Sequence, residues 1–457
     1  MILPLLLSFI FFSGVAQVEI SNFSKSNGLT SNSVLVSKVD SKGVVWIGTA
    51  NGISAYTANG WVQIKSISDN NRYNKFIGRV SIIHEATNGD LWVCGEKGIF
   101  TFNGEYWTYF DDNENEGFQI ADIFEDRRGW IWVTYEKYQS LKDVSVLGFS
   151  MVEGILQMYN GERWHKFTGE IGGSAAIAIG DKKQYFTSHI QDNEGNLWVT
   201  SLDGLYRFDG SRWTEYDQDD IPSDICNEVI QANNNEIWVA TRNGVAVRNN
   251  DEWTEFKKQK GIKGLDAVDF YEDYLNRLWV LSRKDDRFKS ICMYDGSKWK
   301  VFFKDKLKIK GDVDEMITYD SLILVYSDKG VSVNQNGSWV NIIADNKIQD
   351  DHFSNFTRTG QNRILFTGRK GVYEYDGTEL SKRLTYPEGW KANSMLVVDG
   401  IIVVGTDKSG VFLINNNDIV NYNTENGLAD NNIKYVFKDK FSNIWAVTRS
   451  GVSLLER

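Results

Sequence analysis

The sequence has very little proline and cysteine, and each shortage excludes a class of protein. Three prolines among 457 residues, beside 40 glycines and 16 tryptophans, exclude a collagen-like chain and a disordered one. Three cysteines are too few for a fold held together mainly by disulfides. The aromatic residues, 13% of the chain, instead favour packed β-structure.

An excess of positive charge is also lacking. The 61 acidic side chains outnumber the 50 basic ones, which gives a formal net charge of −11. Because affinity for nucleic acid comes largely from lysine and arginine that neutralise phosphates, this balance argues against nucleic-acid binding.

A hydrophobic run long enough to span a membrane is missing too. Residues 1–16 form a short apolar stretch that ends in small residues, as in a signal peptide cleaved before Gln17. A short membrane anchor is the alternative, but this run is too short to span a bilayer. The most apolar later stretch, residues 395–404, is interrupted by Asp399 and Gly400. We expect an exported protein, periplasmic or at the cell surface, whose mature part is residues 17–457 with no transmembrane segment.

The three cysteines show no metal-binding spacing. Cys94 lies inside the strand-like LWVCG and Cys292 inside ICMYDG, where a small buried residue is expected. We interpret them as structural, with a Cys226–Cys292 disulfide as the alternative.

One phrase recurs along the chain with a period of about forty residues. It consists of an acidic or asparagine turn, a strand with tryptophan, a glycine turn, a second strand, another turn, and then tryptophan beside an aromatic residue. The first tryptophan of the phrase falls at Trp46, Trp92, Trp132, Trp198, Trp238, Trp279 and Trp445. The second falls at Trp61, Trp107, Trp164, Trp213, Trp253, Trp299 and Trp339. Recurrence at one strand position predicts packing between repeats rather than ligand contact.

Each repeat reads as four short antiparallel strands. Asn-Gly or Asp-Gly pairs precede the fourth strand in most repeats, and such pairs are typical of tight hairpins. Four strands per repeat without helical periodicity indicate propeller blades. We therefore predict an all-β protein, a β-propeller of about ten four-stranded blades. Two smaller rings, or one merged pair of repeats, are the alternatives.

The two chain ends complement each other. Residues 18–24 have the pattern of a fourth strand, whereas the chain stops at Arg457 after a third strand. We expect the N-terminal strand to complete the last blade and so close the ring, which removes two exposed strand edges.

The repeats resemble a known family. The segments NGLTSNSVLVSKVDSKGVVWIGTANGISAY, from Asn27, and ENGLADNNIKYVFKDKFSNIWAVTRSGV, from Glu425, are similar to the two-component regulator propeller repeat. That family forms the periplasmic ligand-sensing region of hybrid two-component systems, and many of its members respond to oligosaccharides. The resemblance covers essentially the whole mature chain and implies a propeller sensor. In the family an immunoglobulin-like domain, a membrane helix and a histidine kinase commonly follow, whereas here we expect a free-standing propeller.

Irregular loops mark one face as the candidate ligand face. Because strands alternate in direction, the loops after the second and fourth strands emerge on the same face. There the repeat is broken by Trp390 and by a possible hairpin insertion at residues 135–157. We expect Trp390 to offer an exposed ring for sugar stacking, with secondary platforms at Tyr386, Tyr73 and Tyr138. Trp390 folded back as a plug over a blade edge is the alternative.

Lysine or arginine also recurs in the loops after the second strand. A ring of such cations would suit a carboxylated or sulfated ligand, and we single out Arg242, Arg369 and Arg449 as binding residues. Ordinary solvated turn charges, partly cancelled by nearby acidic loops, are the alternative.

Signs of catalysis are weak. His84, His165, His189 and His352 fall at non-equivalent places with no metal-ligand spacing, and the acidic run DDNENEG from Asp111 lacks the spacing of a calcium loop. We expect no cofactor, no metal and no enzyme activity. The chain is read as a propeller that recognises a glycan or related small ligand and has an envelope or signalling protein as a second possible partner. A cell-envelope scaffold is the alternative, and a streptogramin-lyase-like enzyme a weaker one.

Overall fold

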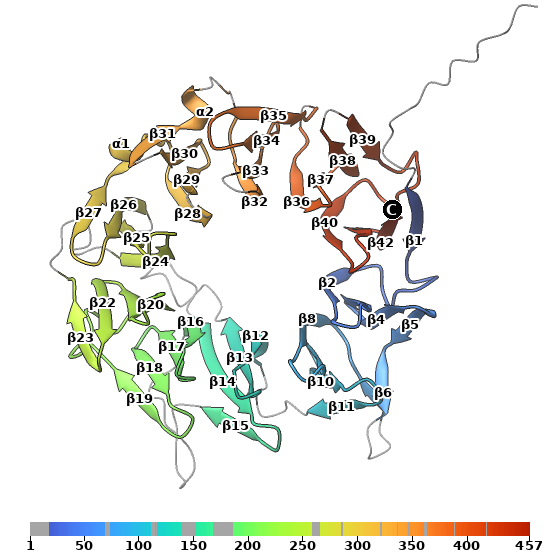
Figure 1. Ribbon diagram of the computed structural model, residues 1–457. Coiled ribbons are helices and arrows are strands. Elements are labelled where there is room, and N and C mark those ends of the chain that lie inside the picture. The colour runs from blue at the N-terminus through green and yellow to red at the C-terminus, as the bar shows by residue number, and fades with distance from the viewer. Residues whose placement is uncertain are drawn as a thin grey trace, which may run out of the picture.

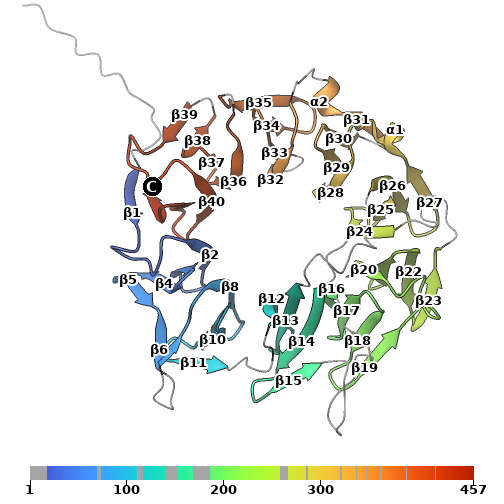
Figure 2. The same ribbon diagram turned by 180° about the vertical axis from the view of Figure 1, so that it is seen from behind.

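Each repeat folds into a four-stranded antiparallel sheet, and ten such sheets stand side by side in one ring (Figure 1). The view from behind shows the same single ring (Figure 2). The predicted ten-bladed propeller is confirmed, and two separate rings are excluded. This computed structural model describes residues 18–68, 74–110, 115, 117–138, 152–167, 186–257, 266–284, 287–319, 322–335, 337–345, 348, 350–360, 363–387, 389–416 and 418–457.

The strands of a blade, a to d, follow each other from the inner rim of the ring outward (Figure 1). The a strands are β2 (Val34–Val39), β8 (Val80–Glu85), β12 (Gln119–Glu125), β16 (Phe186–Gln191), β20 (Cys226–Gln231), β24 (Asp266–Glu272), β28 (Val313–Tyr319), β32 (Ser354–Gly360), β36 (Ala392–Val398) and β40 (Ile433–Lys438). The b strands are β3 (Val45–Thr49), β9 (Leu91–Gly95), β13 (Ile131–Tyr138), β17 (Leu197–Ser201), β21 (Ile237–Thr241), β25 (Leu278–Lys284), β29 (Leu322–Ser327), β33 (Arg363–Gly368), β37 (Ile401–Thr406) and β41 (Ile444–Thr448).

The outer half of each blade consists of strands c and d. The c strands are β4 (Gly52–Thr57), β10 (Gly98–Phe102), β14 (Val152–Tyr159), β18 (Leu205–Phe208), β22 (Gly244–Asn249), β26 (Arg287–Tyr294), β30 (Gly330–Gln335), β34 (Gly371–Tyr375), β38 (Val411–Asn415) and β42 (Val452–Glu456). The d strands are β5 (Gly60–Ile64), β11 (Trp107–Phe110), β15 (Trp164–Phe167), β19 (Trp213–Tyr216), β23 (Glu252–Glu255), β27 (Trp299–Phe302), β31 (Ser338–Asn341), β35 (Leu380–Thr385), β39 (Asp418–Tyr422) and β1 (Glu19–Phe23). Blades 1 to 9 are numbered by their a strands from β2 to β36, and blade 10 consists of β40, β41, β42 and β1.

Short additional elements occur in the connections between blades. A hairpin of β6 (Ser66–Ser68) and β7 (Asn74–Phe76) links blades 1 and 2. The helices α1 (Lys304–Leu307) and α2 (Ile342–Asp345) follow the d strands of blades 6 and 7. No helix in the described part of the chain is both long and apolar enough to cross a membrane.

The two ends of the described chain close the ring together, as predicted. β1 pairs antiparallel with β42 in the register Glu19 to Glu456. Beside this ladder, the hydroxyl of Ser453 donates to Asn22 at 2.6 Å, and the amide group of Asn22 donates to the carbonyl of Gly427 at 2.7 Å. The last blade therefore joins segments from the two ends of the chain (Figure 1).

The periodic tryptophans pack between blades, also as predicted. The first tryptophan of each phrase is at most 5% exposed. The second tryptophan of the next blade meets it edge to face in all seven pairs, with ring centroids 6.1 to 6.3 Å apart and planes at 77° to 89°. This edge-to-face arrangement suits the aromatic quadrupole, so the periodic tryptophan rings hold neighbouring blades together.

A β-bulge near the start of every a strand provides a second link between blades. At several bulges the extra residue reaches the carbonyl of the next a strand. The bonds are Thr187 to Cys226 at 2.7 Å, Asn227 to Ala267 at 2.7 Å, Asn393 to Ile433 at 2.7 Å and Lys434 to Val34 at 3.1 Å. The bulges thus satisfy backbone groups at the inner rim, where an a strand has no sheet neighbour on one side.

The three cysteines are buried and free, so the alternative of a Cys226–Cys292 disulfide is wrong. Burial raises the pKa of the Cys292 thiol to about 12 and raises the pKa of the Cys226 thiol as well. Both thiols are therefore protonated at neutral pH and act as small apolar side chains, as the sequence predicts.

Candidate functional site

Trp390, the leading residue of the predicted site, is half-buried at the edge of the core between blades 8 and 9. It lies in the connection from β35 to β36 and packs against a cluster that includes Leu384 and Val404. Its ring centroid is 6.4 Å from that of Phe412. The indole thus covers the end of an inter-blade core, which agrees better with the plug alternative than with a free platform.

Tyr386 is only 5% exposed, so the prediction of a surface stacking platform there is wrong. Its amide donates to the carbonyl of Lys370 at 2.9 Å, which continues the pairing of β35 with β34 by one more residue. Leu384 and Tyr386 therefore point to the same side, into the core. Burial also raises the pKa of the Tyr386 hydroxyl.

The remaining predicted residues do not gather in one place. Arg242, Arg369 and Arg449 follow β21, β33 and β41, which lie in different parts of the ring (Figure 2). Tyr138 ends β13, opposite Val152 of β14, on the far side of the ring from β35 and β36 (Figure 1). Its side chain lies outside the description, as do Tyr73, residues 139–151 of the predicted insertion, residues 111–114 of the acidic run, and the predicted signal peptide.

The expected ring of cations is largely compensated by neighbouring groups. Arg242 lies 3.5 Å from a carboxylate oxygen of Asp266, and Arg369 lies 3.1 Å from one of Asp351. Lys97 pairs with Glu96 at 3.0 Å, and the ammonium of Lys408 donates to the carbonyl of Gly389 at 2.8 Å. Arg449 is exposed. This face therefore presents paired charges rather than a continuous cationic ring.

The opposite face is formed by the a–b and c–d turns, and the same aspartate-to-indole hydrogen bond holds the a–b turn in five of the blades. In blade 4, Asp192 accepts hydrogen bonds from the backbone amides of Glu194 and Asn196 and, at 2.7 Å, from the indole of Trp198. The equivalent aspartates bind the equivalent indoles in four further blades, through Asp40, Asp126, Asp273 and Asp439. The hydrogen bond from each tryptophan to the aspartate six residues before it is thus structural, because it ties the a–b turn to strand b.

Blade 5 departs from this pattern in both of its turns on that face. Ala232 stands where Asp192 stands in blade 4, and the turn glycine is replaced by Asn235, whose φ is 70°. The usual Asn-Gly or Asp-Gly pair is replaced by Asn250 and Asp251, with φ of 50° and 69°. Left-handed backbone at these three residues preserves the turns without glycine, because asparagine and aspartate tolerate it best.

A further departure lies on the wall between blades 4 and 5. At five other junctions an aromatic ring at the end of strand c covers the first tryptophan of the preceding blade, with centroids 5.3 to 5.9 Å apart. Blade 5 has Arg248 at this position, with its guanidinium 5.5 Å from the ring centroid of Trp198. Arg207 approaches the same indole at 5.8 Å. Cations thus take the place of an aromatic contact.

These departures line a groove of about 490 Å³ between the two blades. Its walls carry five asparagine side chains together with carboxylates and one arginine. They are Asn193, Asn234, Asn235, Asn249 and Asn250, with Asp192, Glu194, Glu236, Asp251 and Arg248 among the other lining residues.

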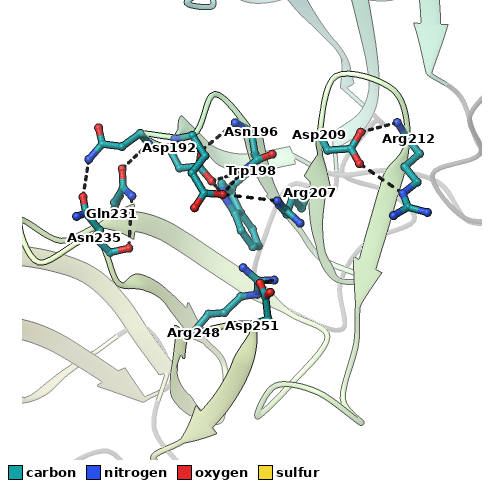
Figure 3. A network of polar contacts seen from close by, with 12 residues as sticks. Asp192, Asn196, Trp198, Arg207, Asp209, Arg212, Gln231, Asn235, Arg248 and Asp251 are labelled. Atoms are coloured by element: carbon teal, nitrogen blue, oxygen red, sulfur yellow. Dashed lines mark hydrogen bonds and ion pairs between the residues drawn. The ribbon is translucent and has the colours of Figure 1, made fainter.

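Hydrogen bonds hold the two walls in place (Figure 3). The side-chain amide of Asn193 in blade 4 donates to that of Asn235 in blade 5 at 2.6 Å, and its backbone amide donates to Gln231 at 2.8 Å. Arg248 binds the carboxylate of Asp251 at 2.5 Å. The groove is therefore a preorganised polar surface of amides and paired charges.

The carboxylate of Asp209, in the neighbouring c–d turn, is also held by hydrogen bonds. The backbone amide of Arg212 is the main cause that lowers the pKa of Asp209, and the hydroxyl of Ser211 adds to it, at the c–d turn of blade 4 (Figure 3). That carboxylate is thus a turn cap held in its charged form.

The sequence analysis missed this groove because it favoured the other face. The signal was nonetheless present as a loss of repeat consensus, since residues 232–236 and 248–251 read ANNNE and RNND.

Evidence for a catalytic or metal centre is lacking in the described residues. They contain no group of three or more histidine, cysteine, aspartate or glutamate side chains that could hold a metal ion. Burial lowers the pKa of His84 and His189, which lie on separate inner strands. His352 lies instead beside Arg369, 3.0 Å from its guanidinium.

Comparison with known proteins gives likeness in fold only. No model of a known protein family matches the sequence, and no curated protein does. Similar solved structures include the extracellular domains of two proteins described as hybrid two-component systems of B. thetaiotaomicron. One is 14% identical, with a TM-score of 0.37, over 93% of this chain and 56% of the other. The second is also 14% identical, with a TM-score of 0.33, over 96% and 81%.

A virginiamycin B lyase from Staphylococcus aureus is similar as well. It is 16% identical, with a TM-score of 0.33, over 68% of this chain and 95% of the lyase. This chain spans little more than half the length of the first of these extracellular domains. At these identities the likeness concerns the propeller fold and assigns neither ligand nor activity.

Proposed function

We propose that this chain is an exported, non-catalytic propeller that recognises a glycan or a related polyhydroxylated ligand, as part of sensing in the periplasm or at the cell surface. The observation that carries the proposal is the groove between blades 4 and 5, where the departures from the repeat meet on one surface. Export is supported by the apolar stretch at residues 1–16.

The chemistry of the groove suits hydroxyl groups. Each asparagine amide offers both donors and an acceptor, and each carboxylate offers acceptors, so together they match a hydroxyl that donates one bond and accepts others. A volume of about 490 Å³ lies within the usual range for small-ligand sites, roughly 300–1,000 Å³. The exposed carboxylates are partly balanced, since Glu194 lies 3.9 Å from Arg207 and Asp251 binds Arg248. A neutral saccharide therefore fits better than a strongly charged ligand.

The residues that line the groove are better explained by ligand binding than by the needs of the fold. In five other blades the turn position that Ala232 takes in blade 5 holds an aspartate that binds the indole, and at five other junctions the end of strand c carries an aromatic ring. Blade 5 retains its fold without this aspartate, because the carboxylate of Glu236 accepts the hydrogen bond of the Trp238 indole at 3.2 Å. The left-handed backbone of the turns accounts for Asn235 and Asn250, but not for the gathering of five asparagines around one groove.

The experiment begins with a glycan array that includes neutral and acidic oligosaccharides. The best neutral oligosaccharide is then titrated calorimetrically into the wild type, Asn234→Ala and Asn88→Ala. Asn234 and Asn88 occupy the same turn position in blades 5 and 2, and each accepts a backbone amide, at 3.2 Å and 2.9 Å. Asn88 is thus a matched control for any loss of turn stability.

We expect Asn234→Ala to weaken binding by roughly three- to tenfold, as for the loss of one or two neutral hydrogen bonds. Asn88→Ala should bind like the wild type. Equal affinities of all three proteins would reject the groove, and an array without any bound glycan would reject the proposed ligand class.

A further inference from the structure

A second cavity lies at the inner rim, where blades 6, 7 and 8 adjoin. It has a volume of about 430 Å³ and is lined by residues of β24, β28, β29 and β32. Figures 1 and 2 both place β24, β28 and β32 on the inside of the ring. This cavity is therefore separate from the groove between blades 4 and 5.

Aromatic rings form much of its lining. Tyr271, Tyr319, Tyr326 and Phe356 contribute from all three blades. Tyr326 and Phe356 face each other across the junction of blades 7 and 8, with centroids 4.4 Å apart and planes at 31°. The lining is thus rich in aromatic rings, whose faces carry the negative part of the aromatic quadrupole.

One carboxylate stands among these rings. Glu315 is exposed, accepts the hydroxyl proton of Tyr326 at 2.7 Å, and is the only residue with a formal charge among those that line the cavity in the described chain. No lysine or arginine of the described chain is part of this lining. The cavity is consequently both aromatic and anionic.

Carboxyl groups stand at the equivalent position of the two preceding inner strands. Asp269 and Glu228 each follow the β-bulge by one residue, as Glu315 does. Burial raises the pKa of Asp269, the charge of Arg283 opposes this, and Glu315 raises it further. Arg283 is held to one side, because its guanidinium donates to the carbonyl of Asp314 at 2.9 Å.

The other polar groups of the cavity are already engaged by the protein. The hydroxyl of Thr318 donates to the carbonyl of Glu272 at 3.2 Å, and the side-chain amide of Asn355 donates to the hydroxyl of Thr367 at 3.0 Å. A saccharide, which needs several free hydrogen-bonding partners, fits this lining poorly. A cation, which needs ring faces and a carboxylate, fits it well.

We propose that this inner-rim cavity binds an organic cation, such as a quaternary ammonium or guanidinium group carried by a small molecule. The rings of Tyr326 and Phe356 contact the cationic head, and Glu315 supplies the opposite charge. The net charge of −11 favours the approach of such a ligand. The site is independent of glycan binding in the groove.

The test uses choline and its uncharged isostere 3,3-dimethylbutan-1-ol, each titrated calorimetrically into the intact protein. We expect choline to bind and the alcohol to bind at least about tenfold more weakly, since the two differ only in charge. Comparable binding of both compounds, or no binding of choline, would overturn the proposal.

Two variants then locate the site. Glu315→Gln should weaken choline binding by about tenfold, and Phe356→Leu should also weaken it. Glu105→Gln removes an equal charge from an exposed turn of blade 2 and should leave binding unchanged. Equal affinities of the Glu315 and Glu105 variants would mean a diffuse charge effect and would reject the cavity. Asn234→Ala should bind choline like the wild type, which keeps this test separate from that of the groove.

Discussion

The guanidinium of Arg248 lies 5.5 Å from the ring centroid of Trp198, at a position where five other junctions of the ring place an aromatic side chain. The contact keeps the indole covered and directs a charge toward the surface, where Asp251 binds it. Blade 5 thus retains the inter-blade contact of a propeller while it presents polar groups to solvent.

Restoring an aromatic residue at this position should show whether Arg248 contributes to the stability of the fold. We expect Arg248→Tyr to unfold at the same temperature as the wild type or higher, because a ring on Trp198 contributes about 0.5–1.5 kcal/mol beyond its buried area. The reciprocal change Phe208→Arg, at a ring only 2% exposed, should cost about 3–5 kcal/mol. Thermal unfolding followed by circular dichroism measures both. A clear loss of stability in Arg248→Tyr would show that the arginine is there for the fold.

Asp192 should prove important for stability in spite of its position beside the groove. Asp192→Ala leaves the indole of Trp198 and two backbone amides without their acceptor, which should cost about 2–4 kcal/mol. Asp90→Ala, in the same turn of blade 2, removes a carboxylate bonded at 2.9 Å to the side chain of Asn88 and should cost about 1 kcal/mol or less. Similar melting temperatures for the two variants would contradict the structural role of the phrase.

The fold was predictable because its determinants repeat. Period, turn pairs and tryptophan spacing each recur in many copies, so a single irregular repeat could not hide the ten blades. Closure was also visible, because β1 carries the fourth-strand pattern that the last blade lacks.

The candidate site was less predictable, because its contacts depend on which turns face each other in space. The pairing of Arg369 with Asp351, or of Asn193 with Asn235, joins residues 18 and 42 positions apart. Burial of Tyr386, in contrast, could have been predicted from the alternation of Leu384, Thr385 and Tyr386 along one strand. The breaks in consensus at blade 5 were visible too, but the sequence does not show that they meet across a groove.

Deletion of residues 18–23 should destabilise the whole ring. Without β1, the outer edge of β42 and the side chain of Ser453 lose their partners, and an unpaired strand edge promotes aggregation. We expect a large fall in melting temperature together with oligomers in size-exclusion chromatography. A monomeric deletion variant with the wild-type melting temperature would contradict closure as a source of stability.

The stability of the ring should depend on pH through Glu228. Burial is the main cause that raises the pKa of this carboxyl to about 7 from an ordinary 4.5. The folded protein therefore binds a proton more tightly than the unfolded chain, so Glu228 favours folding at low pH. That contribution is lost as the pH rises from about 4.5 through 7.

Glu228→Gln mimics the protonated form and keeps an acceptor for the amide of Phe270. At pH 8 we expect it to be more stable than the wild type by up to about 3 kcal/mol, with the difference vanishing near pH 4. Melting temperatures measured from pH 4 to 8 provide the comparison. A constant difference across this range would contradict a raised pKa at Glu228.

Trp390 should matter for packing rather than for glycan affinity. Trp390→Ala removes a half-buried ring from the core between blades 8 and 9, and we expect a loss of about 1–3 kcal/mol. Affinity for the oligosaccharide selected on the array should stay the same. Weakened binding at an unchanged melting temperature would instead restore Trp390 as a stacking platform on the other face.

The central claim is that the glycan lies between blades 4 and 5. Hydrogen–deuterium exchange, read by mass spectrometry with and without the selected oligosaccharide, tests it most directly, because bound ligand slows local opening of the backbone it covers. The account predicts protection of residues 192–196, 231–236 and 247–252. Protection of residues 368–371 and 385–391 with none in the groove would contradict it.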